Sequence, residues 1–294
     1  MEFEKIKNDL DKISLPVYVQ FVAENNGRTC IACQRWHGKI FDKDDPLRPQ
    51  LPLHPNCRCR YQDIPINGNS TILQAEKQNI ASTLVGRYSI TAEQADSLAK
   101  QIVVAKMEKK ELASEKLFLL FNGRYLLSSD GQLMLNAVSG KPISEVYSEW
   151  SKMDMLSTQQ TVTRKFNYSY QRQGIANTGG VPEGLYYILC SEMRSIMTSP
   201  VSHFFGQRGW GSYSWSMHPC KNTNMRERGN FFIHGGSESS SAGCIDLREH
   251  DVTLYSFLHR ASKNKLYVYV NYFEENIAVS EKNMIFPVLY PMTY

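Results

Sequence analysis

A histidine and a cysteine ten residues apart are the side chains of this sequence with the clearest capacity for chemistry. His234 closes the apolar run 231–233, and Cys244 follows a short loop rich in glycine and serine. A free thiol is mostly protonated at neutral pH, and its nucleophilic thiolate forms when a nearby base takes the proton. The spacing therefore predicts a nucleophilic site in which His234 takes the thiol proton of Cys244.

The residues between and beside this pair suit attack on an acyl carbon. Gly243 leaves the backbone next to Cys244 bare, so the N–H groups of Gly243 and Cys244 could stabilise the oxyanion that attack creates. Ser239 and Ser241 could orient the imidazole of His234. A buried structural cysteine is the alternative for Cys244. A papain-like site is disfavoured, because there the base follows the cysteine by a long interval.

The motif around the pair resembles the active-site signature of the L,D-transpeptidase (YkuD-type) catalytic domain. The shared pattern begins at His234 and reads His-Gly, a short loop, then Ser-x-Gly-Cys-Ile-x-Leu. The likeness is strongest to the subgroup found as type VI secretion effectors that attack peptidoglycan. Segments 117–142, 181–188 and 228–234 resemble its opening strands, its Pro-x-Gly-x-Tyr-x-Ile segment and its approach to the histidine.

This resemblance implies a mainly β catalytic domain over residues 115–294, built as an L,D-transpeptidase-like β-sandwich or barrel. It implies that Cys244 attacks peptidoglycan stem tetrapeptides at the bond between the diamino acid and D-alanine and forms a thioester. Water would then make the enzyme an L,D-carboxypeptidase, and another amine would make it an L,D-transpeptidase. No cofactor is expected for catalysis. The expected substrate contacts are Arg228, Arg226, Gly235, His218 and Ser239.

Two positions depart from the pattern of that family. Ala242 stands where many members carry a second histidine, and Asp246 stands where many carry arginine or asparagine. The first change removes a residue that is not the expected base. The second leaves open how the substrate's carboxylate is held, because a carboxylate at position 246 repels another carboxylate.

A second group of potential ligands lies near the N-terminus. Cys30 and Cys33 form one close pair, Cys57 and Cys59 form another, and His54 precedes the second pair. Four thiolates, or three thiolates with His54, could hold a tetrahedral structural zinc. Two disulfides are the alternative, and buried reduced thiols are a third.

The segment that carries these cysteines, residues 20–63, resembles the C-terminal motif of the phage Mu F-like head-morphogenesis proteins. The shared features are Arg-Thr-Cys-x-x-Cys, Gly-Lys-x-Phe and a terminal His-Pro-Asn-Cys-Arg-Cys. The resemblance implies a small stapled module. It also supports a second hypothesis for the whole chain, a phage-derived structural or assembly protein without catalysis.

The residue pattern divides the chain into three parts. A capping box at Thr91–Gln94 opens a helical stripe, whereas many short apolar runs after residue 116 are typical of strands. Within the strand-rich part, helices are expected around residues 144–156 and 248–261. The expected parts are a Cys-rich module at 1–64, a helical connector at 65–114 and the catalytic domain at 115–294.

Composition and charge narrow the setting. With 294 residues, 42% of them hydrophobic, and a net charge of +4, the composition is that of a globular protein and does not argue for nucleic acid. The sequence contains no run of eighteen apolar residues, so no membrane span is predicted. Residues 1–15 lack the apolar core of a signal peptide. We therefore expect synthesis in the bacterial cytoplasm and delivery to a target cell's periplasm by a secretion-apparatus carrier, with an immunity protein as a further partner.

Overall fold

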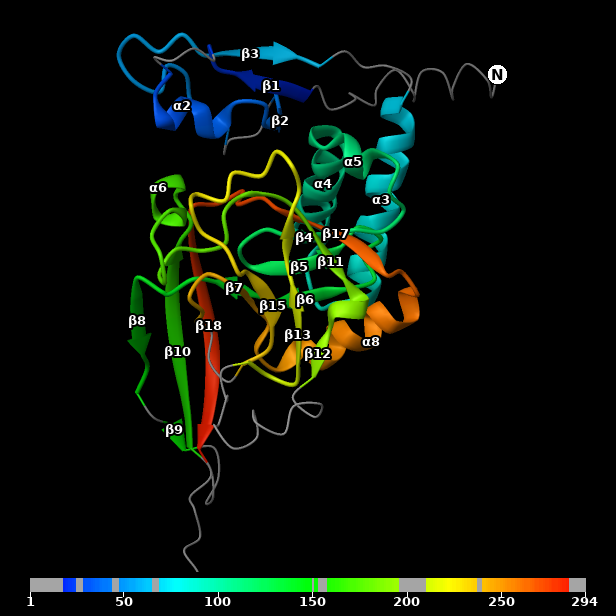
Figure 1. The fold of residues 1–294 in the computed structure, drawn as a ribbon, viewed down its shortest axis with the longest axis vertical. Coiled ribbons are helices and arrows are strands. Elements are labelled where there is room, and N and C mark those ends of the chain that lie inside the picture. The colour runs from blue at the N-terminus through cyan, green and yellow to red at the C-terminus, as the bar shows by residue number, and fades with distance from the viewer. Residues whose placement is uncertain are drawn as a thin grey trace, which may run out of the picture. The chain divides into compact units, whose positions relative to one another are not determined.

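The computed structural model describes residues 18–24, 29–43, 48–64, 69–149, 151–152, 158–195, 210–236 and 240–285. The chain falls into two compact units, Met1–Lys116 and Leu117–Tyr294 (Figure 1). It mixes helices with several sheets, and a cysteine cluster lies in the first unit. Within the described residues, no helix combines the length and the apolar character needed to cross a bilayer.

The first unit begins with a three-stranded antiparallel sheet. Its middle strand buries alternate residues, Val19 and Phe21, because successive side chains of a strand point to opposite faces. Phe21 meets the ring of Tyr61 edge-on, with ring centroids 5.5 Å apart. This small core supports the short helix that contains Cys33 and is capped by Cys30. The elements are β1 (Tyr18–Val22), α2 (Ile31–Trp36), β2 (Ile40–Asp42) and β3 (Arg60–Asp63).

Helices complete the first unit. The capping box is present: Gln94 N donates to Thr91 Oγ1 at 3.2 Å, and Thr91 N donates to Gln94 Oε1 at 3.0 Å. At the other end of the same helix, Glu108 Oε1 accepts the N–H of Ile40 at 2.8 Å, which ties the helix to β2. The expected connector and the Cys-rich module therefore belong to one unit. The helices are α3 (Asn69–Arg87), α4 (Ala92–Glu108) and α5 (Lys110–Ala113).

Three sheets make up most of the second unit (Figure 1). The six-stranded sheet has the order β14-β11-β17-β4-β5-β6, and the five-stranded sheet has the order β12-β13-β15-β16-β7. Their facing side chains share one apolar core. The strands are β4 (Leu119–Phe121), β5 (Tyr125–Ser128), β6 (Met134–Asn136), β7 (Val138–Ser139), β11 (Gly184–Leu189), β12 (Arg194–Ser195), β13 (Tyr213–Ser216), β14 (His218–Pro219), β15 (Phe232–His234), β16 (Ile245–Asp246) and β17 (Lys265–Val270).

The third sheet contains the longest strands. Two ten-residue strands, β10 (green in Figure 1) and β18 (red), pair along their whole length, from Thr158 opposite Ile285 to Asn167 opposite Asn276. β8 pairs with the other edge of β10. The sequence did not predict these two long strands, because the segments are too polar to show a buried face. The strands are β8 (Ser144–Tyr147), β9 (Ser151–Lys152), β10 (Thr158–Asn167) and β18 (Asn276–Ile285).

One of the two expected helices is wrong and the other is confirmed. The described part of residues 144–156 forms strands β8 and β9, because backbone pairing with β10 overrides the local helical pattern. Residues 248–261 are helical as expected. The remaining helical elements are α6 (Tyr170–Gln173) and the 3-10 turns η1 (Cys190–Glu192) and η3 (Arg248–His250), the latter leading into α8 (Asp251–Ala261).

Buried tyrosines brace the segments beneath the cysteine loop. The rings of Tyr168 and Tyr272 stack with centroids 4.2 Å apart, and both side chains lie in the core. The hydroxyl of Tyr272 donates to Val181 O at 2.7 Å, and that of Tyr168 accepts the N–H of Ser139 at 3.1 Å. These contacts fix the segment 139–140, which bonds directly to the loop before Cys244.

Candidate active site and cysteine–histidine cluster

His234 ends strand β15, and Cys244 directly precedes β16, which pairs with β15 in parallel. In the register of β15 and β16, Ile233 lies opposite Ile245 and His234 lies opposite Asp246. The two isoleucines point into the core, so His234 and Asp246 share the other face of the two strands. The side chains of His234 and Cys244 are buried, and among the described contacts no hydrogen bond joins thiol and imidazole.

The imidazole of His234 is held in one tautomer. Its Nδ1 lies 2.5 Å from the carbonyl oxygen of Gly235, and a carbonyl only accepts, so Nδ1 carries the proton and Nε2 presents a lone pair. The Trp210 ring lies against the imidazole, with centroids 4.7 Å apart. Burial lowers the pKa of His234, although the Gly235 carbonyl and the charge of Asp251 oppose the shift. The imidazole is therefore neutral at neutral pH, as a proton acceptor must be.

Asp251 is a positioning residue that the sequence did not reveal. Its buried carboxylate accepts the N–H groups of Ser212 at 2.5 Å and Tyr213 at 2.7 Å. A Cβ on Gly235 would lie 2.5 Å from Asp251 Cγ, so only glycine lets the chain pass this carboxylate after His234. Gly235, expected as a substrate contact, is buried against Asp251. The available signal was an acid in the first turn of the helix expected at residues 248–261, and Asp251 is the first residue of the observed α8.

The thiol of Cys244 is protonated at rest. Burial, together with the charge of Asp246, raises its pKa to about 11. The Phe232 N–H and the Arg228 guanidinium act in the opposite direction on this pKa. A preformed thiolate–imidazolium pair is therefore disfavoured at neutral pH. A thiolate at Cys244 would have to form by transfer of the thiol proton to a base.

Arg228 clamps the loop around Cys244. A Cβ on Gly243, whose φ is +131°, would lie 2.1 Å from Arg228 Nη2, so the guanidinium packs against a backbone that must be glycine. Its charge lowers the pKa of Cys244, but its two terminal nitrogens are bonded to the backbone rather than directed at a substrate carboxylate. They donate to the carbonyls of Gln173 (2.6 Å), Gly180 (2.8 Å), Gly179 (3.0 Å) and Ala242 (3.0 Å).

Ser241 orients the cysteine turn rather than His234. Its hydroxyl donates to Cys244 O at 2.6 Å and accepts the N–H groups of Gly140 at 3.1 Å and Gly243 at 3.2 Å. Because the Gly243 N–H is engaged in this way, the N–H of Cys244 is the remaining donor of the two expected for an oxyanion. Ser239 lies outside the described residues.

The other two expected substrate contacts bond elsewhere. His218 Nε2 lies 2.6 Å from Glu192, and its ring stacks on Tyr187 with centroids 5.0 Å apart. The Arg226 guanidinium lies 3.7 Å from the ring centroid of Tyr170. None of these contacts involves the loop of Cys244, so the described contacts of His218 and Arg226 do not join them to the residues around Cys244.

A different arginine shares the row of His234. Arg194 lies opposite Ser214, and Ser214 lies opposite His234, so the three residues cross one sheet on the same face. Arg194 is exposed, and its Cζ lies 5.4 Å from the ring centroid of Phe232. No ion pair involves its guanidinium within the described part of the chain. The short strand that carries Arg194 was not among the strands the sequence predicted.

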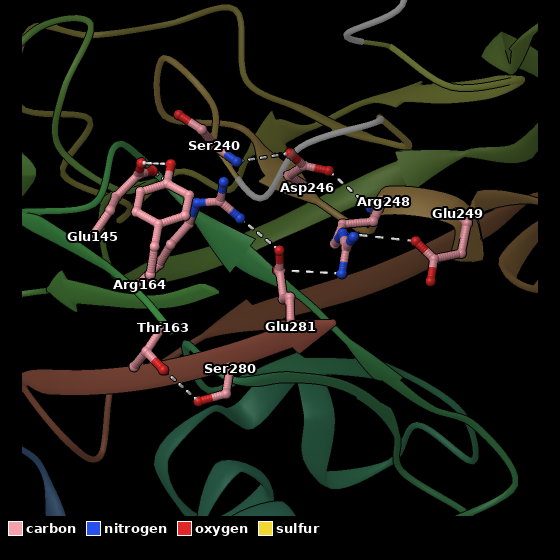
Figure 2. Close-up of polar contacts among 10 residues, drawn as sticks. Glu145, Thr163, Arg164, Ser240, Asp246, Arg248, Glu249, Ser280 and Glu281 are labelled. Atoms are coloured by element: carbon pink, nitrogen blue, oxygen red, sulfur yellow. Dashed lines mark hydrogen bonds and ion pairs between the residues drawn. The ribbon is translucent and has the colours of Figure 1, made fainter. Parts of the chain in front are cut away.

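Asp246 is buried inside its own turn. Its Oδ1 accepts the N–H of Arg248 at 2.8 Å, and its Oδ2 accepts the N–H of Ser240 at 3.2 Å (Figure 2). Burial raises the pKa of this carboxyl to about 7, against the effect of those two N–H groups. Asp246 therefore holds the loop of the nucleophile and does not present its carboxylate to a substrate.

The N-terminal cysteines and His54 form a compact cluster compatible with a structural metal. The Nε2 of His54 lies 3.2 Å from Cys30 Sγ and 3.1 Å from Cys33 Sγ, and the sulfurs of Cys33 and Cys57 are 3.8 Å apart. Zn–S bonds of about 2.3 Å at tetrahedral angles put two sulfurs about 3.8 Å apart. Cys59 joins Cys33 and Cys57 in a second, overlapping group of three.

Local contacts prepare this cluster for a cation. Cys30 caps helix α2, and the Cys33 N–H, 3.4 Å from its sulfur, lowers the pKa of Cys30. Burial acts to raise the pKa of Cys57, but the N–H groups of Cys59 and Leu53 bring it to about 7. The Nδ1 of His54 lies 2.8 Å from Pro55 O, which leaves the lone pair of Nε2 facing the sulfurs.

No family model and no curated protein matches this sequence. The chemistry of the N-terminal cysteine–histidine cluster and of the site at Cys244 and His234 is therefore inferred from their contacts. The cluster joins several sulfurs and an imidazole around one point. The site in the second unit sets a single buried thiol beside a neutral imidazole.

Proposed function

We propose that the unit Leu117–Tyr294 is a cysteine-dependent L,D-transpeptidase or L,D-carboxypeptidase that acts on peptidoglycan stem tetrapeptides. The observation that supports this proposal is the register of β15 and β16, because His234 ends β15 and Cys244 directly precedes β16, the strand paired with it. The bond from His234 Nδ1 to Gly235 O supports it, because it leaves Nε2 as the base. The substrate class rests on the resemblance of the surrounding motif to the L,D-transpeptidase signature.

The reaction needs only proton transfers within the pair. As the thiol of Cys244 attacks the carbonyl carbon, its proton passes to His234 Nε2, and the carbonyl oxygen becomes an oxyanion near the Cys244 N–H. Collapse breaks the amide bond, and the imidazolium returns the proton to the departing amine of the D-amino acid. Water or a second amine then attacks the thioester, gives its proton to His234 and regenerates the thiol.

A guanidinium near the site would hold the substrate's carboxylate. Arg194 takes this role in our proposal, because Arg228 is bonded to backbone carbonyls and Arg226 lies over Tyr170. Arg194 is exposed and sits in the row of His234. Arginine suits this role because its fork of N–H donors matches the two oxygens of a carboxylate.

The decisive experiment incubates the purified chain with tetrapeptide muropeptides and follows the products by mass spectrometry. Loss of the terminal D-alanine, or its exchange for an added D-amino acid, is the expected result, and Cys244→Ala should give neither. Unchanged muropeptides with the wild-type chain would overturn the proposal. That outcome would favour the alternative, a phage-derived structural or assembly protein.

For the cluster in the first unit we propose zinc as the metal. Cysteine and histidine are the ligands that zinc prefers in structural sites, and four of the five side chains complete a tetrahedron. Cys30, Cys33 and His54 supply three ligands, and Cys57 or Cys59 supplies the fourth. Metal analysis of freshly purified protein should give one zinc per chain. Zinc-free protein with Cys30 and Cys57 in disulfides would contradict this assignment.

The biological setting follows from the proposed substrate. Trimming or exchanging stem peptides removes the donors that wall cross-linking needs, so such an enzyme would act as an antibacterial effector in the periplasm of a target cell. A secretion carrier and an immunity protein are the partners this role requires. Expression directed to the periplasm should be toxic, and expression of Cys244→Ala there should not.

A further inference from the structure

Arg248 joins the two arms of the candidate active site through its backbone. Its N–H donates to Asp246 Oδ1 at 2.8 Å, and its carbonyl accepts the N–H of Gly236 at 2.9 Å. Asp246 follows Cys244 by two residues, and Gly236 follows His234 by two. The position of the Arg248 backbone therefore sets the spacing between the nucleophile and the base.

The backbone of Arg248 needs external support to stay in place. Its φ is +53°, in the left-handed region that residues with a Cβ seldom occupy. Such conformations persist where surrounding contacts determine them. The contacts of the Arg248 side chain are therefore candidates for what holds the turn.

A buried carboxylate from the third sheet supplies that contact (Figure 2). Glu281 Oε1 lies 3.3 Å from Arg248 Nη1, and its Oε2 lies 2.6 Å from Arg164 Nη1. The Glu281 side chain is only 5% exposed. On the far side, Arg164 Nε donates to Glu145 Oε1 at 2.7 Å. Among the acids whose carboxylates pair with the Arg248 guanidinium, Glu249 is 67% exposed and lies 3.7 Å from Arg248 Nε, whereas Asp246 accepts the backbone N–H of Arg248.

We propose that Glu281 is a positioning residue for Cys244 and His234 and that it acts through Arg248. The carboxylate lies between two guanidiniums in a buried place, so losing its charge would leave two cations without their shared anion. The Arg248 turn would then lose the contact that fixes it, and the arms of His234 and Cys244 would no longer be held in register. The catalytic part of this inference rests on the function proposed above.

The same network contains a matched control. Glu145 also binds Arg164, but its side chain is 36% exposed, and none of its described contacts reaches the loop of Cys244. Glu281→Gln and Glu145→Gln each remove one negative charge beside the same arginine with no change in side-chain length. Only the first should disturb the site.

The kinetic test compares these two variants of the whole chain on tetrapeptide muropeptides. We expect Glu281→Gln to lower kcat by about 10- to 100-fold with KM changed less than about threefold, because misplaced reacting groups slow the chemical step. Glu145→Gln should stay within about twofold of the wild type. Glu281→Asp, which keeps the charge, should recover part of the rate. Equal kcat for both glutamine variants would overturn the proposal.

A second readout does not need turnover. Alkylation of Cys244 by iodoacetamide, followed by peptide mass spectrometry, reports how firmly the loop encloses the thiol. We expect Glu281→Gln to react at least about fivefold faster at Cys244, with Cys190 in the same unit unchanged as an internal reference. If the wild type shows no turnover, the proposed function fails, and this rate still tests Glu281.

A third variant covers the case in which Glu281→Gln does not fold. Arg248→Gln removes the cation on the loop side and leaves the Arg164–Glu281 pair intact. Like Glu281→Gln, it should raise the alkylation rate of Cys244 and lower kcat. Wild-type alkylation and wild-type kcat in folded Arg248→Gln would show that the ion pair does not position the site.

Discussion

The two regions that combine cysteine with histidine differ in the number of sulfurs they gather and in the pKa values of those sulfurs. In the first unit, several sulfurs lie around His54, and backbone N–H groups lower the pKa values of Cys30 and Cys57. In the second unit a single sulfur, that of Cys244, is buried, and its pKa rises to about 11. Burial raises the pKa values of Cys33 and Cys59, so the first arrangement favours thiolates at Cys30 and Cys57, and the other two thiols would lose their protons on binding a cation. The second keeps a neutral thiol beside a neutral base.

The difference shows that surroundings, rather than residue types, separate a metal cluster from a nucleophilic site. A metal centre needs several deprotonated ligands that converge on one point. A nucleophile needs one thiol, one base and a place for the oxyanion. The two regions can therefore be tested against each other, since a change in one should leave the chemistry of the other unaltered.

The largest expected effect separates the two regions outright. Cys244→Ala should lower turnover of muropeptides by at least about 10³-fold, because the nucleophile is lost, and should leave the zinc content unchanged. Cys30→Ser should lower the zinc content and leave the turnover of muropeptides unchanged. Mass spectrometry of the muropeptides and metal analysis of the same samples measure both. Zinc loss in Cys244→Ala would show that the two regions are not independent.

Metal removal is the next effect in size. Chelation should destabilise the first unit by several kcal/mol, because ligands that share a cation would be left without it. Thermal unfolding with and without a chelator measures the shift. Cys33→Ser should bind less zinc, since Cys33 belongs to both groups of three ligands. Full zinc stoichiometry and an unchanged Tm in Cys33→Ser would contradict the cluster's role.

The sequence predicted the candidate residues better than their contacts. His234, Cys244 and the five N-terminal ligands stand in short segments whose spacing carries the signal, and the structure gathers the N-terminal ligands in two overlapping groups of three. Helix 248–261 and the capping box at Thr91 were likewise legible from local patterns. Local spacing sufficed for the capping box, whose two residues are three apart, whereas the fold brings Cys30 and Cys33 to His54 across more than twenty residues.

Long-range pairing was not predictable in the same way. β10 and β18 are more than a hundred residues apart in the chain, and the alternate residues that β10 buries, Val162, Arg164 and Phe166, include a charged one. The roles of Arg228 and Glu281 depend on carbonyls and guanidiniums that the fold brings from distant segments. Arginines near the histidine in sequence were expected to bind substrate, whereas Arg194, forty residues earlier, shares its row.

The buried carboxyl of Asp246 gives the second region a pH dependence of stability. Its pKa rises from 3.8 to about 7 on folding, so its contribution is fully present below about pH 4 and is lost as the pH rises through 7. The wild type should therefore lose up to about 4 kcal/mol relative to Asp246→Asn between pH 4 and pH 8. Urea unfolding of both proteins across this range measures it. Parallel stability curves would contradict the raised pKa.

Thiol reactivity should show the effect of burial directly. At pH 7 a thiol with a pKa of about 11 has a thiolate fraction on the order of 100-fold below that of an ordinary cysteine. Alkylation of Cys244 should accordingly be slow at pH 7 and rise about tenfold per pH unit up to pH 10. Peptide mass spectrometry after timed alkylation gives the profile. Fast labelling that levels off near pH 7 would instead indicate a preformed thiolate.

The smallest expected effect concerns the charge that faces the substrate. Arg194→Ala should raise KM for tetrapeptide by about tenfold with little change in kcat, because a charge-assisted hydrogen bond contributes about 1.5 kcal/mol to binding in ground state and transition state alike. Arg226→Ala is the matched control, since that guanidinium lies over Tyr170. Steady-state kinetics of both variants decide between them. A larger KM effect at Arg226 would show that Arg226, and not Arg194, binds the substrate's carboxylate. The row of residues across β12, β13 and β15 would then have no role in substrate recognition.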